Sequence, residues 1–318
     1  MKEQIRILVG YDGSSCADAA LDDLRRAGLP RNAEAVILTV AEVWLPAPFN
    51  REPVGTVESS VSTPAAKPSW SQTAAAVAPM SEDRSLAYAA KARLQTRFPS
   101  WVVKVEELSG SPSREILKRA AELKPHLIVV GSQGQSALGR FLLGSVSQKV
   151  VNEARCTVRV SRGTAWKDGS PVRIVIGLDG TAGSEMAVSA VASRVWPTSS
   201  SVRLISVVDP SDGASGERVA PTLKDSAATQ LMRRDWVEKF VKNAAKRLRA
   251  RQLSVSTRIE TGDPKRVLIA DAEEWGADCI FLGASAANNA LARFLLGSVA
   301  TAVVARAHCS VEVVRSGY

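Results

Sequence analysis

The sequence contains the glycine-rich segment Gly131-Ser132-Gln133-Gly134, followed after nine further residues by Gly144-Ser145. The apolar run 127–130 before it predicts a buried strand, and residues 145–151 predict the start of a helix. Glycines let backbone amides approach a phosphate closely, and a helix N-terminus favours negative charge. Strand, glycine-rich turn and helix in this order predict an anion site of the kind that binds a nucleotide.

The chain repeats itself, with the same blocks in the same order in each half. Four blocks recur: ILVGYDGS at 7–14 as IVIGLDGT at 174–181, VILTV at 36–40 as VRLISV at 202–207, GSPSR at 110–114 as GDPKR at 262–266, and LGRFLLGS at 138–145 as LARFLLGS at 291–298. Chance does not produce four ordered matches. The repeat predicts two copies of one domain, residues 1–162 and 172–318, joined by a short linker.

Within each copy, short apolar runs alternate with helical patterns. In the first copy, strands are expected near 5–11, 36–43, 102–108, 127–131 and 157–161, and helices near 15–27, 82–97, 112–123 and 145–154. Such Val, Ile and Leu runs between helices are typical of a buried parallel sheet, so the fold class is α/β. Ser14 or Ser15 is expected to cap the first helix.

One segment, residues 46–79, breaks this alternation. It is rich in Pro, Ala, Ser and Thr and has no periodicity. Such a composition predicts a long surface loop or a partly disordered insertion. A lid over the nucleotide and a partner-docking segment stay open as alternatives.

The formal net charge of +9 raises the question of nucleic-acid binding. The charges are spread along the chain, and the densest basic stretch, Arg247–Arg251, falls at the end of an expected amphipathic helix. Aromatic residues do not interleave with it as they do in a base-stacking platform. A solvated helix face is therefore expected, and no nucleic-acid partner.

The four cysteines, Cys16, Cys156, Cys279 and Cys309, are far apart in the sequence and form no CxxC motif. No metal site is predicted, and reduced, buried thiols are expected. No apolar run reaches the roughly 18 residues of a membrane helix, and the sequence enters a strand without a signal-peptide pattern. A cytoplasmic protein with no membrane partner is expected.

The glycine motif after a hydrophobic strand, in a domain whose first strand ends near Asp12, resembles that of the universal stress proteins. The repeat resembles a tandem member with two fused domains. The resemblance implies two doubly wound domains, each a five-stranded parallel sheet of order 3-2-1-4-5 with helices on both faces. Ligands of such sheets bind at the carboxyl ends of the strands beside the switch point, so Asp12 and Gly131 are expected to meet there.

By resemblance to ATP-binding members of the family, Asp12 and the backbone of Val40 would frame the adenosine. Gly131 and Gly134 would let the turn pass close to the ribose and phosphates. The resemblance implies ATP as the bound cofactor and leaves Mg²⁺ open.

The same resemblance implies that Gly144 and the amides of Ser145 and Val146 would bind the phosphates. The Ser145 hydroxyl has three open roles: to donate to a phosphate, to cap its own helix, or to orient Mg²⁺. Arg140 is the nearest cation in the sequence, and a phosphate contact and a surface role are both open for it.

The second copy departs from the motif. Gly283-Ala284-Ser285-Ala286 has alanine in place of the second glycine, and the interval to Gly297 is one residue longer than in the first copy. A methyl group at a left-handed position costs on the order of 1 kcal/mol. Asp179, Val207, Gly297 and Ser298 remain. One competent nucleotide site is expected, in the first domain, with a weak or lost site in the second.

Motifs of ATP-using enzymes are missing. The sequence has no GxxxxGK[ST], no kinase signature set, and no evident base in the glycine loop. No catalytic residue is predicted. The leading hypothesis is an ATP-binding stress or signalling module; the alternatives are a weak Mg²⁺-dependent ATPase and an interaction scaffold that binds no nucleotide.

The last strand of each copy, 157–161 and 310–314, would lie at the edge of its sheet, and exposed edges tend to pair. Members of the family dimerise through this strand. The two fused copies are therefore expected to pair with each other as a pseudo-dimer, and a further homodimer of chains stays open.

Overall fold

The computed structural model describes residues 4–42, 80–134, 143–163, 169–209, 227–284 and 296–317. The insertion predicted within residues 46–79 lies outside these ranges. So do Arg140, most of the linker and Ala286.

The first domain alternates strands and helices as the sequence predicts. Its elements are β1 (Ile5–Gly10), α1 (Ser15–Asp23) with the 3₁₀ turn η1 (Leu24–Arg26), β2 (Ala33–Ala41), α2 (Met80–Arg97), β3 (Val102–Ser109), α3 (Pro112–Leu123), β4 (Leu127–Gly131), α4 (Ser145–Glu153) and β5 (Thr157–Ser161). The β2 strand begins at Ala33, before the predicted residue 36, because the small apolar residues Ala33 and Ala35 are buried in the core as well. Ser14 caps α1 by accepting a hydrogen bond from the Ala17 amide.

The second domain repeats this order. Its elements are β6 (Arg173–Leu178), α5 (Ala182–Ser193), β7 (Ser201–Val208), α6 (Ala227–Arg249), β8 (Ser254–Thr261), α7 (Pro264–Glu274), β9 (Cys279–Gly283), α8 (Ser298–Arg306) and β10 (Ser310–Val314). The basic stretch from Arg247 lies, as expected, at the exposed end of a helix, where Arg247 pairs with Glu185.

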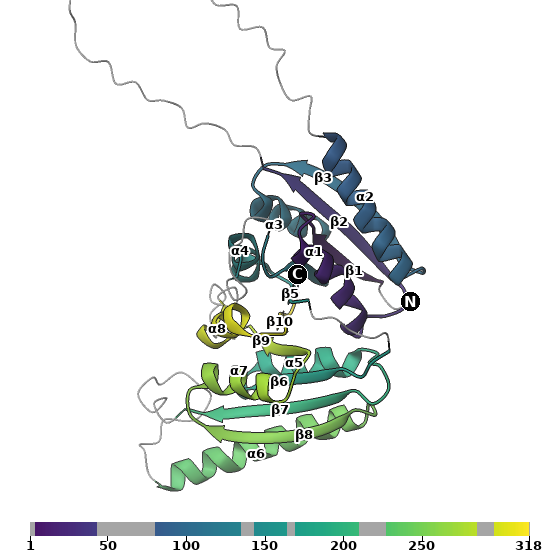
Figure 1. The fold of residues 1–318 in the computed structure, drawn as a ribbon. Coiled ribbons are helices and arrows are strands. Elements are labelled where there is room, and N and C mark those ends of the chain that lie inside the picture. Colours follow the sequence, from purple (N-terminus) through teal and green to yellow (C-terminus); the bar gives the residue numbers. More distant parts are fainter. Residues whose placement is uncertain are drawn as a thin grey trace, which may run out of the picture.

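The ten strands form one sheet of order β3-β2-β1-β4-β5-β10-β9-β6-β7-β8. Each half has the order 3-2-1-4-5 with all neighbours parallel, which confirms the predicted doubly wound fold. In the first domain α1 and α2 pack together on one face, and α3 and α4 on the other; α5 to α8 repeat this arrangement (Figure 1).

The two halves are joined by β5 and β10, which pair antiparallel. Arg159 lies opposite Glu312, and each has a valine on both sides in its own strand. The predicted pseudo-dimer is therefore confirmed: a strand that would be an edge in a single domain lies at the centre of the sheet (Figure 1).

The two faces of this junction differ in chemistry. On the α4 and α8 face, Val158 and Val160 of β5 and Val311 and Val313 of β10 belong to one hydrophobic core that continues through both domains. On the opposite face, the α1 side of the first domain and the α5 side of the second domain have separate cores. Because side chains alternate along a strand, residues 159 and 312 point to this second face.

A buried ionic network fills the space between those two cores. Arg159 binds the Asp23 carboxylate with N–O distances of 2.7 and 3.0 Å, and its side chain is 1 % exposed. It also reaches Glu312 at 3.2 Å, and Glu312 pairs in turn with Arg194. Burial by itself would lower the pKa of Arg159, but the charges of Asp23 and Glu312 more than offset it, so the pKa is raised and the guanidinium stays charged.

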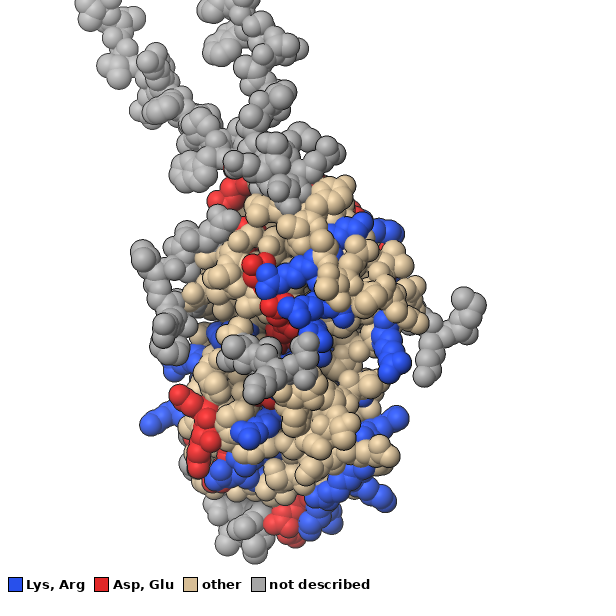
Figure 2. Space-filling view, turned by 45° about the vertical axis from the view of Figure 1, so that its right-hand side comes forward, with Lys and Arg blue, Asp and Glu red and all other residues tan. Residues whose placement is uncertain are grey.

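Elsewhere the charge is distributed. Figure 2 shows Lys and Arg spread over both domains on one face of the molecule, with Asp and Glu among them. Among the described helices, none is long and apolar enough to cross a membrane.

Two neighbouring aspartates test the ionic network. Asp23→Ala should lower the free energy of unfolding by about 3–5 kcal/mol, because it leaves the buried Arg159 without its main partner. Asp22→Ala is the matched control: Asp22 pairs with Arg93 at a partly exposed site, so the loss should be about 1 kcal/mol or less. Urea unfolding measures both, and equal losses would contradict this role of Asp23.

Candidate functional site

The carboxyl ends of β1 and β4 form the switch point of the first domain. These strands are neighbours, while β2 lies on the far side of β1 and β5 on the far side of β4. The chain therefore leaves β1 and β4 toward opposite sides, and a crevice opens where they end. Asp12, just after β1, and Gly131, the last residue of β4, come to the same edge, as the sequence predicts.

The turn that holds Asp12 is fixed by local hydrogen bonds. The Asp12 Oδ1 atom accepts from the Ser14 amide at 3.0 Å, and Ser14 Oγ accepts from the Ala17 amide at 3.1 Å to cap α1. Ser14 Oγ also lies 3.5 Å from the carbonyl oxygen of Gln133 in the β4 turn. The two turns are thus held to each other, with the Asp12 carboxylate between them.

Both glycines of the β4 turn make close approaches. A Cβ on Gly134 would lie 2.9 Å from Asp12 Oδ2, so the carboxylate would have to shift from this position to make room. A Cβ on Gly131 would lie 2.9 Å from the backbone carbonyl carbon of Cys16, at the start of α1. The structure therefore gives Gly131 a packing reason that the sequence motif alone does not reveal.

The start of α4 lies against the same turn. The Gly144 amide donates to the Ser132 carbonyl at 2.8 Å, which closes the loop that begins after β4. Ser147 Oγ donates to the Gly131 carbonyl at 2.6 Å and ties the helix to the strand. The glycine turn and the N-terminus of α4 are therefore adjacent, as the motif predicts.

Gly144 is the N-cap of α4, and Ser145 is its first helical residue. Of the three roles left open for the Ser145 hydroxyl, capping its own helix is excluded, because the cap position belongs to Gly144. The Ser145 side chain is exposed instead. The amides of Ser145 and Val146 precede the first hydrogen bond of the helix, from Gln148 to Gly144, so they have no acceptor within it.

Val40 lies where β2 extends past the end of β1. The Leu38 carbonyl accepts from the Tyr11 amide at 3.0 Å, which is the last bond from β1 to β2. Residues two apart in a strand present their backbone groups to the same side. The Val40 amide and carbonyl therefore face the crevice beyond β1, which is the geometry that backbone recognition of a ligand needs.

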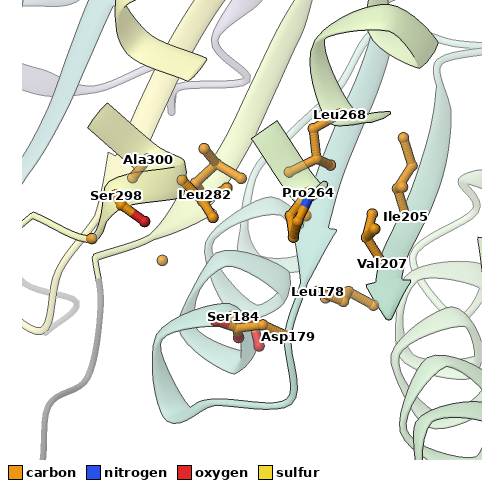
Figure 3. Close-up of a pocket in the computed structure, with 14 residues that line it drawn as sticks. Leu178, Asp179, Ser184, Ile205, Val207, Pro264, Leu268, Leu282, Ser298 and Ala300 are labelled. Carbon is orange, nitrogen blue, oxygen red and sulfur yellow. The ribbon is translucent and has the colours of Figure 1, made fainter. Parts of the chain in front are cut away.

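The second domain has a pocket at the matching place (Figure 3). Figure 3 shows Ile205 and Val207 on one side and Ser298 and Ala300 on the other, with Asp179 below. The pocket is lined by residues of every strand end and helix start around the switch point: Gly177, Leu178, Asp179, Ser184, Ile205, Val207, Pro264, Leu268, Leu282, Gly283, Gly297, Ser298, Val299 and Ala300.

The retained residues Asp179, Val207, Gly297 and Ser298 all line this pocket. Asp179 is fixed like Asp12: its Oδ1 atom accepts from the Thr181 amide at 3.0 Å and from the Thr181 hydroxyl at 2.6 Å. The remaining lining residues are apolar or glycine apart from Ser184, and the described lining includes no Lys or Arg. Anion binding here would depend on the amides at the start of α8.

Some lining residues were not among the predicted site residues. Examples are Ile205, Pro264 and Leu268, which line the pocket but lie outside the glycine motif. A signal for Pro264 was present, because it lies in the repeated block GSPSR/GDPKR at the start of α3 and α7. A sequence block that is repeated in both domains at the start of a helix beside the switch point therefore indicates residues that line the pocket.

A family comparison decides the classification. The model of the universal stress protein family matches residues 5–162 and again residues 172–315. The chain belongs to the universal stress protein family. A universal stress protein of Mycobacterium tuberculosis is 28 % identical over 320 residues, covering 99 % of this chain and 98 % of that protein. One from Methanocaldococcus jannaschii is 45 % identical over 62 residues, 19 % of this chain and 36 % of that protein.

Solved structures of universal stress proteins share the whole two-domain fold. One from Archaeoglobus fulgidus matches with a TM-score of 0.60 at 19 % identity, covering 98 % of each chain. A putative universal stress protein from Pseudomonas aeruginosa matches with a TM-score of 0.62 at 14 % identity, covering 98 % of this chain and 93 % of that one. At these identities the likeness concerns the fold.

The cysteines of this universal stress protein are free thiols, and the described residues contain no cluster of His, Cys, Asp and Glu that would hold a metal. Burial raises the pKa of Cys156 and of Cys279 to about 12, and it raises that of Cys309 as well. Cys16, beside Gly131, is partly exposed.

A thiol-reactive dye tests this arrangement. With a pKa near 12, only about 0.01 % of a thiol is the reactive thiolate at pH 8. The native protein should therefore react rapidly at one thiol, Cys16, and at the other three only after unfolding. Cys16→Ser should abolish the fast phase; a fast phase that survives this substitution would contradict the assignment.

Proposed function

We propose that this universal stress protein binds ATP in its first domain and acts as a nucleotide-dependent stress or signalling module. The observation that carries the proposal is the placement of three features around one crevice. These are the Asp12 carboxylate beside Gly134, the backbone of Val40 beyond the end of β1, and the amides at the start of α4.

The residues present suit an adenine nucleotide. The amides of Ser145 and Val146 offer donors to the phosphates, and the helix dipole of α4 favours their negative charge. The Asp12 carboxylate offers acceptors for hydroxyl groups of the ribose, and the backbone of Val40 offers a donor and an acceptor to the base. Mg²⁺ would accompany the triphosphate, with the exposed Ser145 hydroxyl as one group able to orient it. Arg140 remains a sequence-based candidate for the phosphates.

Binding is favoured over turnover by the position of Asp12. Its carboxylate is engaged with the Ser14 amide and lies beside Gly134. In the proposed pose it faces the nucleoside, so it does not activate water at the terminal phosphate. The proposal therefore assigns no catalytic residue, and a cytoplasmic location stays a prediction from the sequence.

For the second domain we propose a weaker site. Its pocket keeps Asp179, Val207, Gly297 and Ser298, so the walls alone do not prevent binding. The difference from the first domain is the alanine and the extra residue in the glycine loop. The same fold then carries one strong and one weak site, which gives each domain a distinct response to nucleotide concentration.

Calorimetric titration of the full chain with ATP and Mg²⁺ tests the proposal. Asp12→Ala should weaken the binding at the strong site by about tenfold or more, because it removes a charged hydrogen-bonding partner. Asp179→Ala is the matched control, since Asp179 makes the corresponding bond to the turn of the second domain. It should leave the strong site unchanged.

The same titration, together with an assay of phosphate release, distinguishes the alternative functions. Equal loss in both variants, or loss only in Asp179→Ala, would contradict a strong site in the first domain. No heat with wild type would favour the interaction scaffold. Phosphate release that falls on Ser145→Ala would favour the weak ATPase.

A further inference from the structure

The pair formed by β5 and β10 has two faces, and the two copies resemble each other on only one of them. Matching Asp12 to Asp179, Gly131 to Gly283 and Ser145 to Ser298 gives each interface residue a counterpart in the other domain. Counterparts across this junction are related by an approximate two-fold axis, which passes between Arg159 and Glu312. An interface of identical halves would have the same residue at both of these positions.

The face toward α4 and α8 is symmetric. Arg162 Nη2 donates to the Val304 carbonyl in the last turn of α8, at 2.6 Å. Its counterpart Arg315 donates to the Val151 carbonyl in the last turn of α4, also at 2.6 Å. Val158 and Val160 of β5 likewise have valines as counterparts, Val311 and Val313 of β10. This face would fit a like domain as well as it fits the other domain.

The face toward α1 and α5 is asymmetric, beginning at the axis. Arg159 has Glu312 as its counterpart, and both side chains are buried, 1 % and 0 % exposed. Each also has a counter-ion in its own domain: Asp23 for Arg159, and Arg194 for Glu312. The counterparts of Asp23 and Arg194 are Ala190 and Ala27, so neither counter-ion exists in the other copy.

Two further contacts on this face have no equivalent between the counterpart residues. Arg26 pairs with Asp278 at 2.5 Å, whereas their counterparts are Ser193 and His126. Gly28 receives the ring of Trp196, which lies 3.0 Å from the position of a Cβ. The counterpart of Gly28 is Val195, whose side chain would occupy that space.

We propose that this asymmetric face makes the junction selective: the β5 edge of the first domain accepts the β10 edge of a second domain, in the same chain or in another copy, and rejects another first domain. Pairing of two first domains would bring two Arg159 side chains together at the axis, and pairing of two second domains would bring together two Glu312 side chains. Like charges in a dry interface are repulsive, and such clashes are how interfaces exclude wrong partners. Within one chain, the β5 edge of the first domain is thereby paired with the β10 edge of the second domain.

Charge reversal in full-length chains tests the selectivity. Arg159→Glu places Glu opposite Glu312, and Glu312→Arg places Arg opposite Arg159, so each variant has like charges in every pairing with itself. When the two variants are refolded together, the first domain of one can meet the second domain of the other with Arg159 opposite Glu312. Native mass spectrometry with mass-tagged chains should show heterodimer in about tenfold or greater excess over either homodimer.

The matched control uses the symmetric face. Arg162→Met and Arg315→Met each remove one donor to a backbone carbonyl. The two donors act independently, so pairing a domain of one variant with a domain of the other does not favour the heterodimer. Their mixture should show no such excess. An excess in this control as large as in the charge-reversed mixture, or a statistical distribution in both, would overturn the proposal.

A double-mutant cycle covers the case in which charge reversal prevents folding or dimer formation. Arg159→Met, Glu312→Gln and the double variant keep the size of the side chains. The urea midpoint of the double variant should lie above the value expected from adding the two single losses, because the residues are coupled. Additive losses would overturn the proposal, since a selective pair must be a coupled one.

Discussion

The rest of the structure depends on the antiparallel pairing of β5 with β10. Side chains alternate along these strands, so one face carries valines that join the cores of both domains, and the other carries the opposed charges of Arg159 and Glu312. A buried ion pair is stable only where every charge is matched, and here Asp23 and Arg194 complete the match. The junction therefore fixes one register and one orientation of the two domains.

That junction determines where the two candidate sites lie. Each domain opens its crevice between its first and fourth strands, at the carboxyl ends of a parallel sheet. The loop before α4 begins at β4, the strand next to β5, and the loop before α8 begins at β9, the strand next to β10. The C-terminal turns of α4 and α8 are held by Arg315 and Arg162 of the opposite domain. Each proposed phosphate-binding helix is thus anchored at its far end by the other domain.

Much of this followed from the sequence. The apolar runs fixed the strands, the repeated blocks fixed the two domains, and the glycine motif located the switch point, because each signal is local. The Asp23–Arg159 pair could not be predicted, since its members are 136 positions apart and no local pattern links them. The sequence left the cap of α4 open, because a serine after a glycine is compatible with the cap position and with the first helical turn; in the structure the cap is Gly144. The repeated block marks Pro264 in the sequence, but only the three-dimensional arrangement shows that Pro264 lines the same pocket as Asp179.

The proposed function requires that the first domain bind one ATP. Equilibrium dialysis of the full chain against ATP with Mg²⁺, followed by denaturation and identification of the released compound by mass spectrometry, measures this directly. Binding should saturate first at one ATP per chain, recovered intact, with a second ATP bound only at much higher concentration. A chain that holds no more nucleotide than the surrounding buffer at any concentration would contradict it.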